Sequence, residues 1–285
     1  MPGRFLRGNP VALVLIAIAS VQSGSSVAKL LFGLATPYEV TLLRSAFACL
    51  VLLVLAPPRP RGHTTADWVA VVAYGLSLAG MNLMFYLSIE RIPIGLAVTL
   101  EFLGPLLLAL RGAGRLRDYL WVGLAAIGVV LLGAFPSDAD IIGMGLAVGA
   151  GAFWAAYILL AGQVGRRWPG ASGLTAACIV AAVALLLPAP WLGSVALARP
   201  AVLGLGLLVA LMSTVVPYGL ELAARRELSS GTFGILMSLE PAAAALFAWL
   251  IVGELLGWQE WVAMGCVVVA SVGATRSRIR GRTAG

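Results

Sequence analysis

The sequence has few charged residues. Asp, Glu, Lys and Arg make up 11% of its 285 residues, whereas hydrophobic residues make up 61%. A soluble domain keeps roughly a quarter of its residues charged to cover its surface, so this composition excludes an ordinary soluble protein. Apolar runs of about 20 residues recur, and each is long enough to cross a hydrocarbon core of about 30 Å as a helix. Because backbone amides in lipid need internal partners, the sequence predicts an all-α integral membrane protein.

Histidine and cysteine are also scarce. The single histidine, His63, lies in a polar loop, and the three cysteines (Cys49, Cys178 and Cys266) lie within apolar runs. A structural disulfide is therefore not expected, and no His/Cys cluster is available to bind a metal. The Gly-x-x-x-x-Gly-Lys-Ser/Thr pattern of ATP-hydrolysing proteins is absent as well. We expect no cofactor.

The placement of charge argues against nucleic-acid binding and against catalysis. The net charge is +7, but the arginines stand in ones, twos and threes between apolar runs, without a long basic arm. We interpret them as topology signals and expect no nucleic-acid partner. An intramembrane enzyme would need paired aspartates, a zinc motif or a serine with a histidine. No aspartate lies within a predicted span, so we predict that the chain is not an enzyme.

Breaks marked by Pro, Gly, Arg and Asp divide the sequence into ten predicted transmembrane helices. Their approximate bounds are 10–33, 38–56, 67–89, 93–110, 118–135, 141–163, 173–190, 200–223, 231–251 and 258–275. With a cytoplasmic N-terminus, the outer segments hold only Arg91 and Arg199, which agrees with the positive-inside rule and places both termini in the cytoplasm. Most spans are rich in small residues that allow close helix packing; in the sixth these include Gly143, Gly145, Gly149 and Gly151.

The N-terminus allows a second interpretation. Arg4 and Arg7 precede an apolar stretch that reaches Ala17-Ile-Ala19-Ser20, a pattern similar to a secretory signal peptide with its cleavage site. Cleavage would remove the first half of the first span. We favour a retained helix, because the internal repeat described next needs this span.

The second half of the chain repeats a pattern of the first. At a shift of 139 residues, Gly95-Leu-Ala-Val-Thr-Leu-Glu101 falls on Gly234-Ile-Leu-Met-Ser-Leu-Glu240. The fourth span thereby overlays the ninth, so residues 1–138 and 139–285 each hold five spans. An odd number of spans per half means that the halves enter the membrane in opposite directions. The sequence predicts two inverted five-helix repeats, an arrangement that many secondary transporters use.

These motifs resemble a known family. The segment Met81-Asn-Leu-Met-Phe-Tyr-Leu-Ser-Ile-Glu-Arg-Ile-Pro-Ile-Gly-Leu-Ala-Val-Thr-Leu-Glu-Phe-Leu-Gly-Pro105 is similar to the bacterial threonine/homoserine exporters of the drug/metabolite transporter superfamily. Gly231-Thr-Phe-Gly-Ile-Leu-Met-Ser-Leu-Glu-Pro241, followed by Gly253-Glu254, resembles the second EamA-type repeat. The resemblance implies a ten-helix inner-membrane carrier that exports small hydrophilic metabolites and is driven by the proton gradient. The first half departs from it, with Arg111-Gly-Ala-Gly-Arg115 where the second has Gly253-Glu254.

Five ionisable residues lie within predicted spans: Lys29, Arg44, Glu101, Glu221 and Glu240. Each charge near the bilayer centre costs roughly 2.5–3.5 kcal/mol on the insertion scale, so such groups are functional candidates. Arg44 and Glu101 lie at similar depth, where an ion pair would offset both desolvation costs. That pair could bind substrate or merely hold two helices together. Glu240 has no cation at matching depth, so if only one glutamate titrates during transport, we expect it to be Glu240.

The other two groups each have two interpretations. By hydropathy, Glu221 lies near the inner interface, where it would pair with Arg225 at i+4. By the repeat, Glu221 overlays Asn82 and would line a cavity. Lys29 lies about one turn from the outer end of its span, and we expect its side chain to extend to the interface.

Polar and aromatic residues within the spans complete the candidate substrate site. Asn82 and Tyr86 share a helix face, Trp154 and Tyr157 are three residues apart on the sixth span, and Tyr218 follows a proline. Most membrane aromatics only pack or anchor at interfaces, so each aromatic alone is a weak candidate. The prolines Pro105, Pro217 and Pro241 can each break a span and free backbone groups for a ligand.

We therefore expect a secondary active transporter of the bacterial inner membrane that exports small amino acids of the threonine/homoserine kind by alternating access and is coupled to protons. Alternatives are an exporter of other metabolites or drugs on the same fold, and a passive facilitator. The expected partners are a small-molecule substrate, protons and the lipid bilayer, and the chain would act as a monomer or a homodimer.

Overall fold

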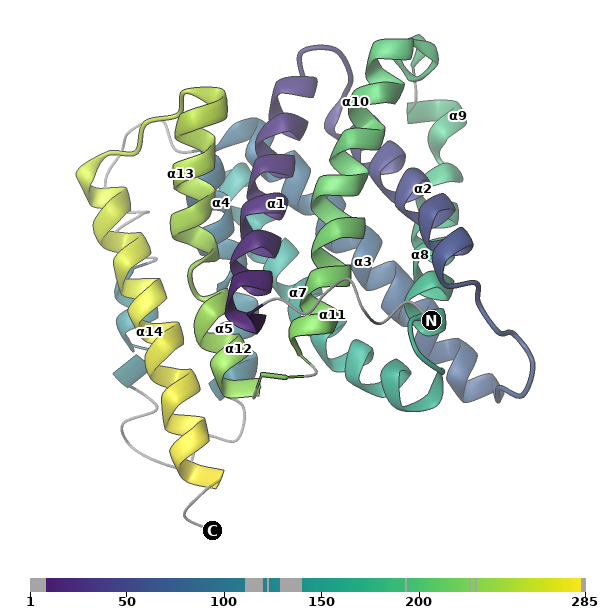
Figure 1. The fold of residues 1–285 in the computed structure, drawn as a ribbon. Coiled ribbons are helices and arrows are strands. Elements are labelled where there is room, and N and C mark those ends of the chain that lie inside the picture. The colour runs from purple at the N-terminus through teal and green to yellow at the C-terminus, as the bar shows by residue number, and fades with distance from the viewer. Residues whose placement is uncertain are drawn as a thin grey trace.

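The computed structural model describes residues 9–110, 120–121, 123–128, 140–192, 194–225, 227–228 and 230–282 (Figure 1). Within these ranges the chain is helical and contains no strand. Six helical segments are long and apolar enough to cross a membrane, by length and composition: Pro10–Leu31, Pro37–Leu55, Thr65–Arg91, Ile141–Arg167, Pro200–Glu221 and Thr232–Val252. An all-α membrane protein, as the composition predicts, is therefore confirmed.

The helices follow the predicted spans closely. They are α1 (Pro10–Leu31), α2 (Pro37–Leu55), α3 (Thr65–Arg91), α4 (Ile94–Glu101), α5 (Leu103–Leu110), α7 (Ile141–Arg167), α8 (Ser172–Leu186), α9 (Ala189–Leu192), a 3-10 turn η1 (Val195–Ala198), α10 (Pro200–Ala210), a π-helical turn η2 (Leu211–Val215), α11 (Val216–Ala224), α12 (Ser230–Met237), α13 (Glu240–Val252) and α14 (Trp258–Arg282). Most of the predicted fifth span, 118–135, lies outside the described residues, so the ten-helix prediction stays a prediction.

Prolines lie at irregular points of three predicted spans. A proline lacks the N–H that would bond the carbonyl four residues earlier, and its ring clashes with that carbonyl. Helix α4 ends at Glu101, four residues before Pro105, and α12 ends at Met237, four residues before Pro241. Before Pro217 the helix does not break but widens into the π-helical turn η2. The prediction of a break is therefore confirmed for Pro105 and Pro241, whereas at Pro217 the helix continues through a π-helical turn.

Glycines allow several helices to pack at close range. A Cβ at Gly143 would lie 2.9 Å from the Cβ of Arg91, and one at Gly149 would lie 2.8 Å from the sulfur of Met84. Gly151 of α7 faces the backbone of Glu101, where any side chain would overlap it. Gly145, by contrast, faces open space. Small residues on α7 thus bring it against α3 and against the break between α4 and α5.

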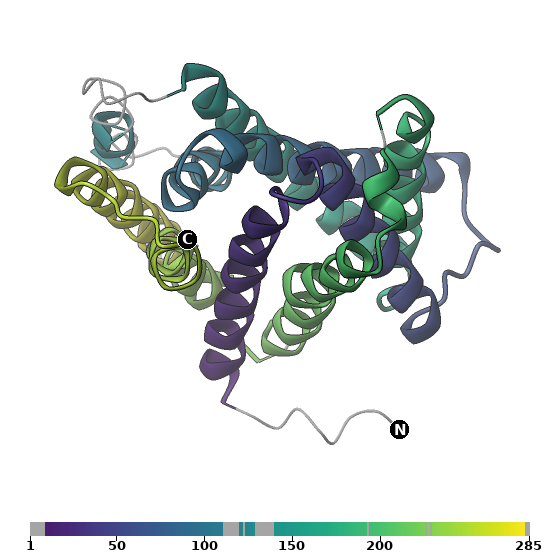
Figure 2. The same cartoon turned by 90° about the horizontal axis from the view of Figure 1, so that it is seen from above.

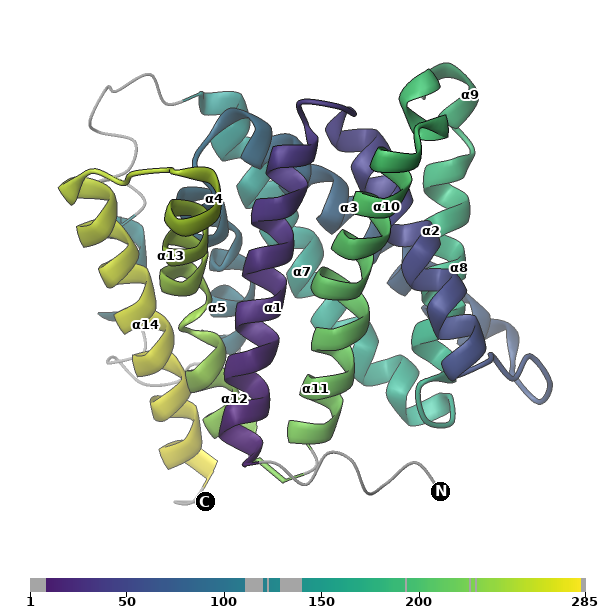
Figure 3. The same cartoon turned by 45° about the horizontal axis from the view of Figure 1, so that its top comes forward.

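The two ends of the bundle differ. Helix α1 begins and α14 ends at the same end, the lower one in Figures 1 and 3, which we call the termini end. Seen from above, α1 lies between α13–α14 on one side and α10–α11 on the other (Figure 2). At the opposite end, which we call the distal end, buried apolar side chains fill the space between helices; they include Leu31, Ile89, Ile92 and Ile94.

Candidate functional site

A cavity of about 540 Å³ lies among the helices. Its wall includes eight of the nine residues that the sequence predicts as a site: Arg44, Asn82, Glu101, Trp154, Tyr157, Tyr218, Glu221 and Glu240. The ninth, Tyr86, does not line the cavity; it is fully buried behind Arg44 and accepts a hydrogen bond from it at 3.2 Å. The structure therefore brings together side chains from both halves of the chain.

Arg44 is held by the second half of the chain. Its Nε donates to Thr214 Oγ1 at 3.0 Å, and its Nη2 donates to the carbonyl of Ser213 at 2.9 Å. That carbonyl is four residues before Pro217, which has no N–H to donate to it. The planar guanidinium suits this arrangement, because it can donate in several fixed directions at once.

The expected ion pair between Arg44 and Glu101 is not formed. Both side chains line the cavity, but the ion pairs among the described residues do not include this one. Three of the five N–H donors of Arg44 are directed instead to Thr214, Tyr86 and the Ser213 carbonyl. These acceptors could not be predicted from the sequence, because two of them lie about 170 residues from Arg44 along the chain.

Both interpretations of Glu221 are partly right. Glu221 lines the cavity, and it also accepts from Arg225 at 3.4 Å across one helical turn. Arg225 lines the same cavity and lies over the ring of Phe233, with 4.2 Å between its guanidinium carbon and the ring centroid. This cluster lies where α11 ends and α12 begins, and Figure 3 shows these helix ends at the termini end of the bundle.

Glu101 and Glu240 lie at the helix breaks. Glu101 is the last residue of α4 and is 8% exposed; Glu240 is the first residue of α13 and is 7% exposed. Neither carboxylate pairs with a cation among the described residues. Both face the cavity, so a ligand or a proton could supply the missing positive charge.

Aromatic rings enclose the cavity from α7 and α11. Trp154 packs edge-on against Phe102, with 5.4 Å between ring centroids. Tyr157 packs against Tyr74 at 5.0 Å, and Tyr218 lines the wall nearby on α11. These rings form an apolar surface beside the charged groups, which is the usual composition of a small-molecule site.

Besides Arg225, sequence reasoning missed four polar wall residues: Gln22, Ser25, Ser213 and Ser271. Gln22 and Ser25 are three residues apart on α1, and this spacing on one helix face was the available signal. The π-helical turn that places Ser213 in the cavity wall has no reliable sequence pattern. Gln22 Oε1 and Ser213 Oγ are buried and have no hydrogen-bond partner within the described part of the chain.

Lys29 forms an ion pair at the distal end of the bundle, and the expectation that its side chain extends to the interface stays a prediction. Its Nζ lies 2.5 Å from Glu254 Oε1 and donates to the carbonyl of Ile92 at 3.0 Å. The other oxygen of Glu254 accepts from the backbone N–H of Ile94 at 2.8 Å, at the start of α4. A single ion pair thus joins the end of α1, the start of α4 and the segment between α13 and α14 at the distal end.

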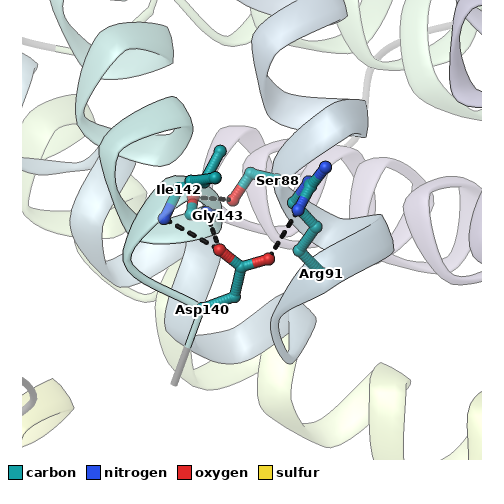
Figure 4. Close-up of polar contacts among 5 residues, drawn as sticks. All are labelled: Ser88, Arg91, Asp140, Ile142 and Gly143. Atoms are coloured by element: carbon teal, nitrogen blue, oxygen red, sulfur yellow. Dashed lines mark hydrogen bonds and ion pairs between the residues drawn. The ribbon is translucent and has the colours of Figure 1, made fainter. Parts of the chain in front are cut away.

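A second polar cluster joins α3 and α7 at the same end (Figure 4). Arg91 donates to Asp140 at 2.7 Å, and Asp140 also accepts from the backbone N–H groups of Ile142 and Gly143. Ser88 donates to the carbonyl of Gly143 at 2.8 Å. The bond from Arg91 and those from the N–H groups hold the pKa of Asp140 below its ordinary value. This cluster fixes the distal end of the helix pair.

Comparison with known proteins agrees with this arrangement. The EamA-like transporter family matches residues 141–276. The chain is 41% identical over 269 residues to the threonine/homoserine exporter RhtA of Escherichia coli (strain K12) and of Salmonella typhimurium (strain LT2), covering 93% of this chain and 91% of each relative. One solved crystal structure has the same fold, with a TM-score of 0.63 at 17% identity, over 94% of this chain and 98% of that chain. The chain therefore belongs to the EamA-like transporters of the drug/metabolite transporter superfamily, and it is a multi-pass membrane transporter rather than an enzyme.

Proposed function

We propose that this chain is a secondary active exporter of small amino acids of the threonine and homoserine kind in the bacterial inner membrane. The relatives named above are threonine/homoserine exporters. The observation that carries the proposal is the cavity of about 540 Å³, which offers both signs of charge to one small ligand. A zwitterionic amino acid needs a cation for its carboxylate and an anion for its ammonium group.

The charges in the cavity leave one negative group in excess. Three carboxylates (Glu101, Glu221 and Glu240) face it together with two guanidinium groups (Arg44 and Arg225). Glu221 and Arg225 pair with each other. Arg44 then remains for the carboxylate of the substrate, while Glu101 and Glu240 remain for its ammonium group and for a proton.

This excess provides a route to proton coupling. A proton and a substrate ammonium group compete for the same buried carboxylates, because two positive charges in one small apolar site repel each other. Release of substrate on one side of the membrane then favours proton uptake there. The carrier would exchange an entering proton for a leaving amino acid.

Alternating access follows from two inverted repeats, residues 1–138 and 139–285. Several pairs of residues related by the shift of 139 line the same cavity, which supports the repeat: Asn82 with Glu221, Val98 with Met237, and Glu101 with Glu240. The cavity wall reaches Arg225 and Leu228 at the termini end, whereas apolar side chains fill the distal end. With both termini cytoplasmic, this arrangement is the inward-facing one.

Purified protein in proteoliposomes tests the proposal. We expect labelled threonine to show counterflow against internal threonine or homoserine, and a pH gradient to drive its accumulation. Glu101→Gln and Glu240→Gln remove the two unpaired carboxylates one at a time, and Glu90→Gln is the matched control, because Glu90 is exposed at the end of α3. At least one of the first two variants should lose pH-driven transport.

The outcomes separate the parts of the proposal. Full pH-driven transport in both variants would refute coupling through these carboxylates. Saturable counterflow distinguishes a carrier from a channel-like facilitator, since a channel does not exchange one labelled molecule for one unlabelled molecule. Absence of threonine and homoserine counterflow in the wild type would refute the assigned substrate class.

A further inference from the structure

Two polar atoms in the cavity wall, Gln22 Oε1 and Ser213 Oγ, have no hydrogen-bond partner in the part of the chain that the structure describes. Gln22 is 2% exposed and Ser213 is 1% exposed, and both line the cavity. Burial of an unpaired polar atom is costly, and most buried polar groups in native proteins are paired. Gln22 and Ser213 therefore keep unused hydrogen-bonding capacity in the wall of the cavity.

Contacts beside these two residues hold α1 against η2. Ser20 Oγ donates to the carbonyl of Met212 at 2.7 Å, which ties α1 to η2. Gly24 lies against Ser213, and any larger residue there would overlap the serine side chain. The carbonyl of Ser213 accepts from Arg44, which fixes the same turn from the other side. The position of the two polar atoms thus does not depend on a mobile loop.

The side chains of Gln22 and Ser213 suit an uncharged polar group of a ligand. The Gln22 oxygen can only accept, whereas the Ser213 hydroxyl can donate and accept. A ligand hydroxyl complements both, since it carries one donor and two lone pairs. The charged groups of an amino acid have stronger partners in the same cavity, in Arg44 and the unpaired carboxylates. The neutral pair is left for an uncharged polar group.

We propose that Gln22 and Ser213 form a subsite for the side-chain hydroxyl of the substrate. The substrate O–H donates to Gln22 Oε1, and its oxygen accepts from Ser213 Oγ–H. The subsite rests on the proposed function and sharpens it: it selects hydroxylated small amino acids over analogues of similar size that lack the hydroxyl. A site built to bond a hydroxyl discriminates strongly, because an analogue without it leaves buried groups unpaired.

The test compares threonine and homoserine with 2-aminobutyrate, which is the deoxy analogue of both. Counterflow is measured in proteoliposomes for the wild type, Gln22→Met and Ser213→Ala. Ser26→Ala is the matched control: it removes a buried hydroxyl from α1 that donates to the Gln22 carbonyl at 2.9 Å and does not line the cavity. The readout is the ratio of kcat/KM for threonine to that for 2-aminobutyrate.

We expect the wild type and Ser26→Ala to favour threonine strongly. Each subsite variant should lower the ratio by about tenfold or more, while 2-aminobutyrate transport is kept or improved, which also shows that the variant is folded. An unchanged ratio would overturn the subsite. An equal loss for both amino acids would overturn it too, because it would assign the two residues to the common ammonium or carboxylate group. If the wild type transports neither hydroxylated amino acid, the proposed function itself fails.

Discussion

The Lys29–Glu254 ion pair is the contact whose loss should most clearly favour opening of the distal end. It joins α1, the start of α4 and the segment after α13 through one carboxylate. All three must separate if the cavity is to open at that end. Lys29→Met removes the charge and keeps most of the apolar stem, so it perturbs the pair with little change in packing.

The magnitude follows from burial. The side chains of Lys29 and Glu254 are 18% and 14% exposed, so the pair lies between an exposed one, worth about 0–1 kcal/mol, and a buried one, whose disruption costs about 3–5 kcal/mol. We take about 2 kcal/mol, which changes the ratio of open to closed forms by about 30-fold. Glu254→Gln should have a smaller effect, since its amide oxygen can still accept from the N–H of Ile94.

Accessibility of a single cysteine measures this ratio. Val98→Cys, in a background with the three native cysteines replaced, places a thiol in the cavity wall one to two turns below the ion pair. A membrane-impermeant maleimide added outside intact cells should label it about 30-fold faster in Lys29→Met.

The control for labelling is Arg91→Gln. The Arg91–Asp140 pair lies at the same end, but its side chains are 41% and 28% exposed, so its loss should change labelling by less than about twofold. Equal labelling of the Lys29→Met and Arg91→Gln proteins would refute the assignment of Lys29 and Glu254 to distal closure.

Three further predictions concern packing, binding and pH. Gly151→Ala should destabilise the solubilised protein by about 1–3 kcal/mol, because a Cβ would overlap the backbone of α4, whereas Gly145→Ala faces open space and should leave its thermal unfolding unchanged. Arg44→Lys should raise the KM for threonine counterflow about tenfold or more, since an ammonium group cannot donate in the directions of the guanidinium. The bond from Arg91 holds the pKa of Asp140 in the folded protein below the ordinary value of 3.8. The charged Asp140 therefore contributes its full stabilisation above pH 3.8, and this stabilisation is lost as the pH falls through the lower pKa of the folded state. The Tm difference between wild type and Asp140→Asn should therefore be largest near neutral pH and shrink at strongly acidic pH.

Much of the fold could be predicted because its causes are local. The length of an apolar run and the position of a proline both act within a few residues, so the spans and the breaks at Pro105 and Pro241 follow from the sequence. The partners of Arg44 could not be predicted in this way. Ser213 and Thr214 become acceptors only where η2 packs beside α2, far away in sequence. Glu221 illustrates the same limit, since its depth depends on where α11 ends.

The positions of the two prolines make Glu101 and Glu240 unequal, although the repeat duplicates them. Pro105 lies four residues after Glu101, whereas Pro241 directly follows Glu240. Glu101 consequently ends α4, and Glu240 falls in the first turn of α13. The N-terminal end of a helix favours a negative charge, and Glu240 occupies that position in α13, whereas Glu101 lies at the C-terminal end of α4. The comparison of Glu101→Gln with Glu240→Gln decides which of the two carboxylates carries the proton.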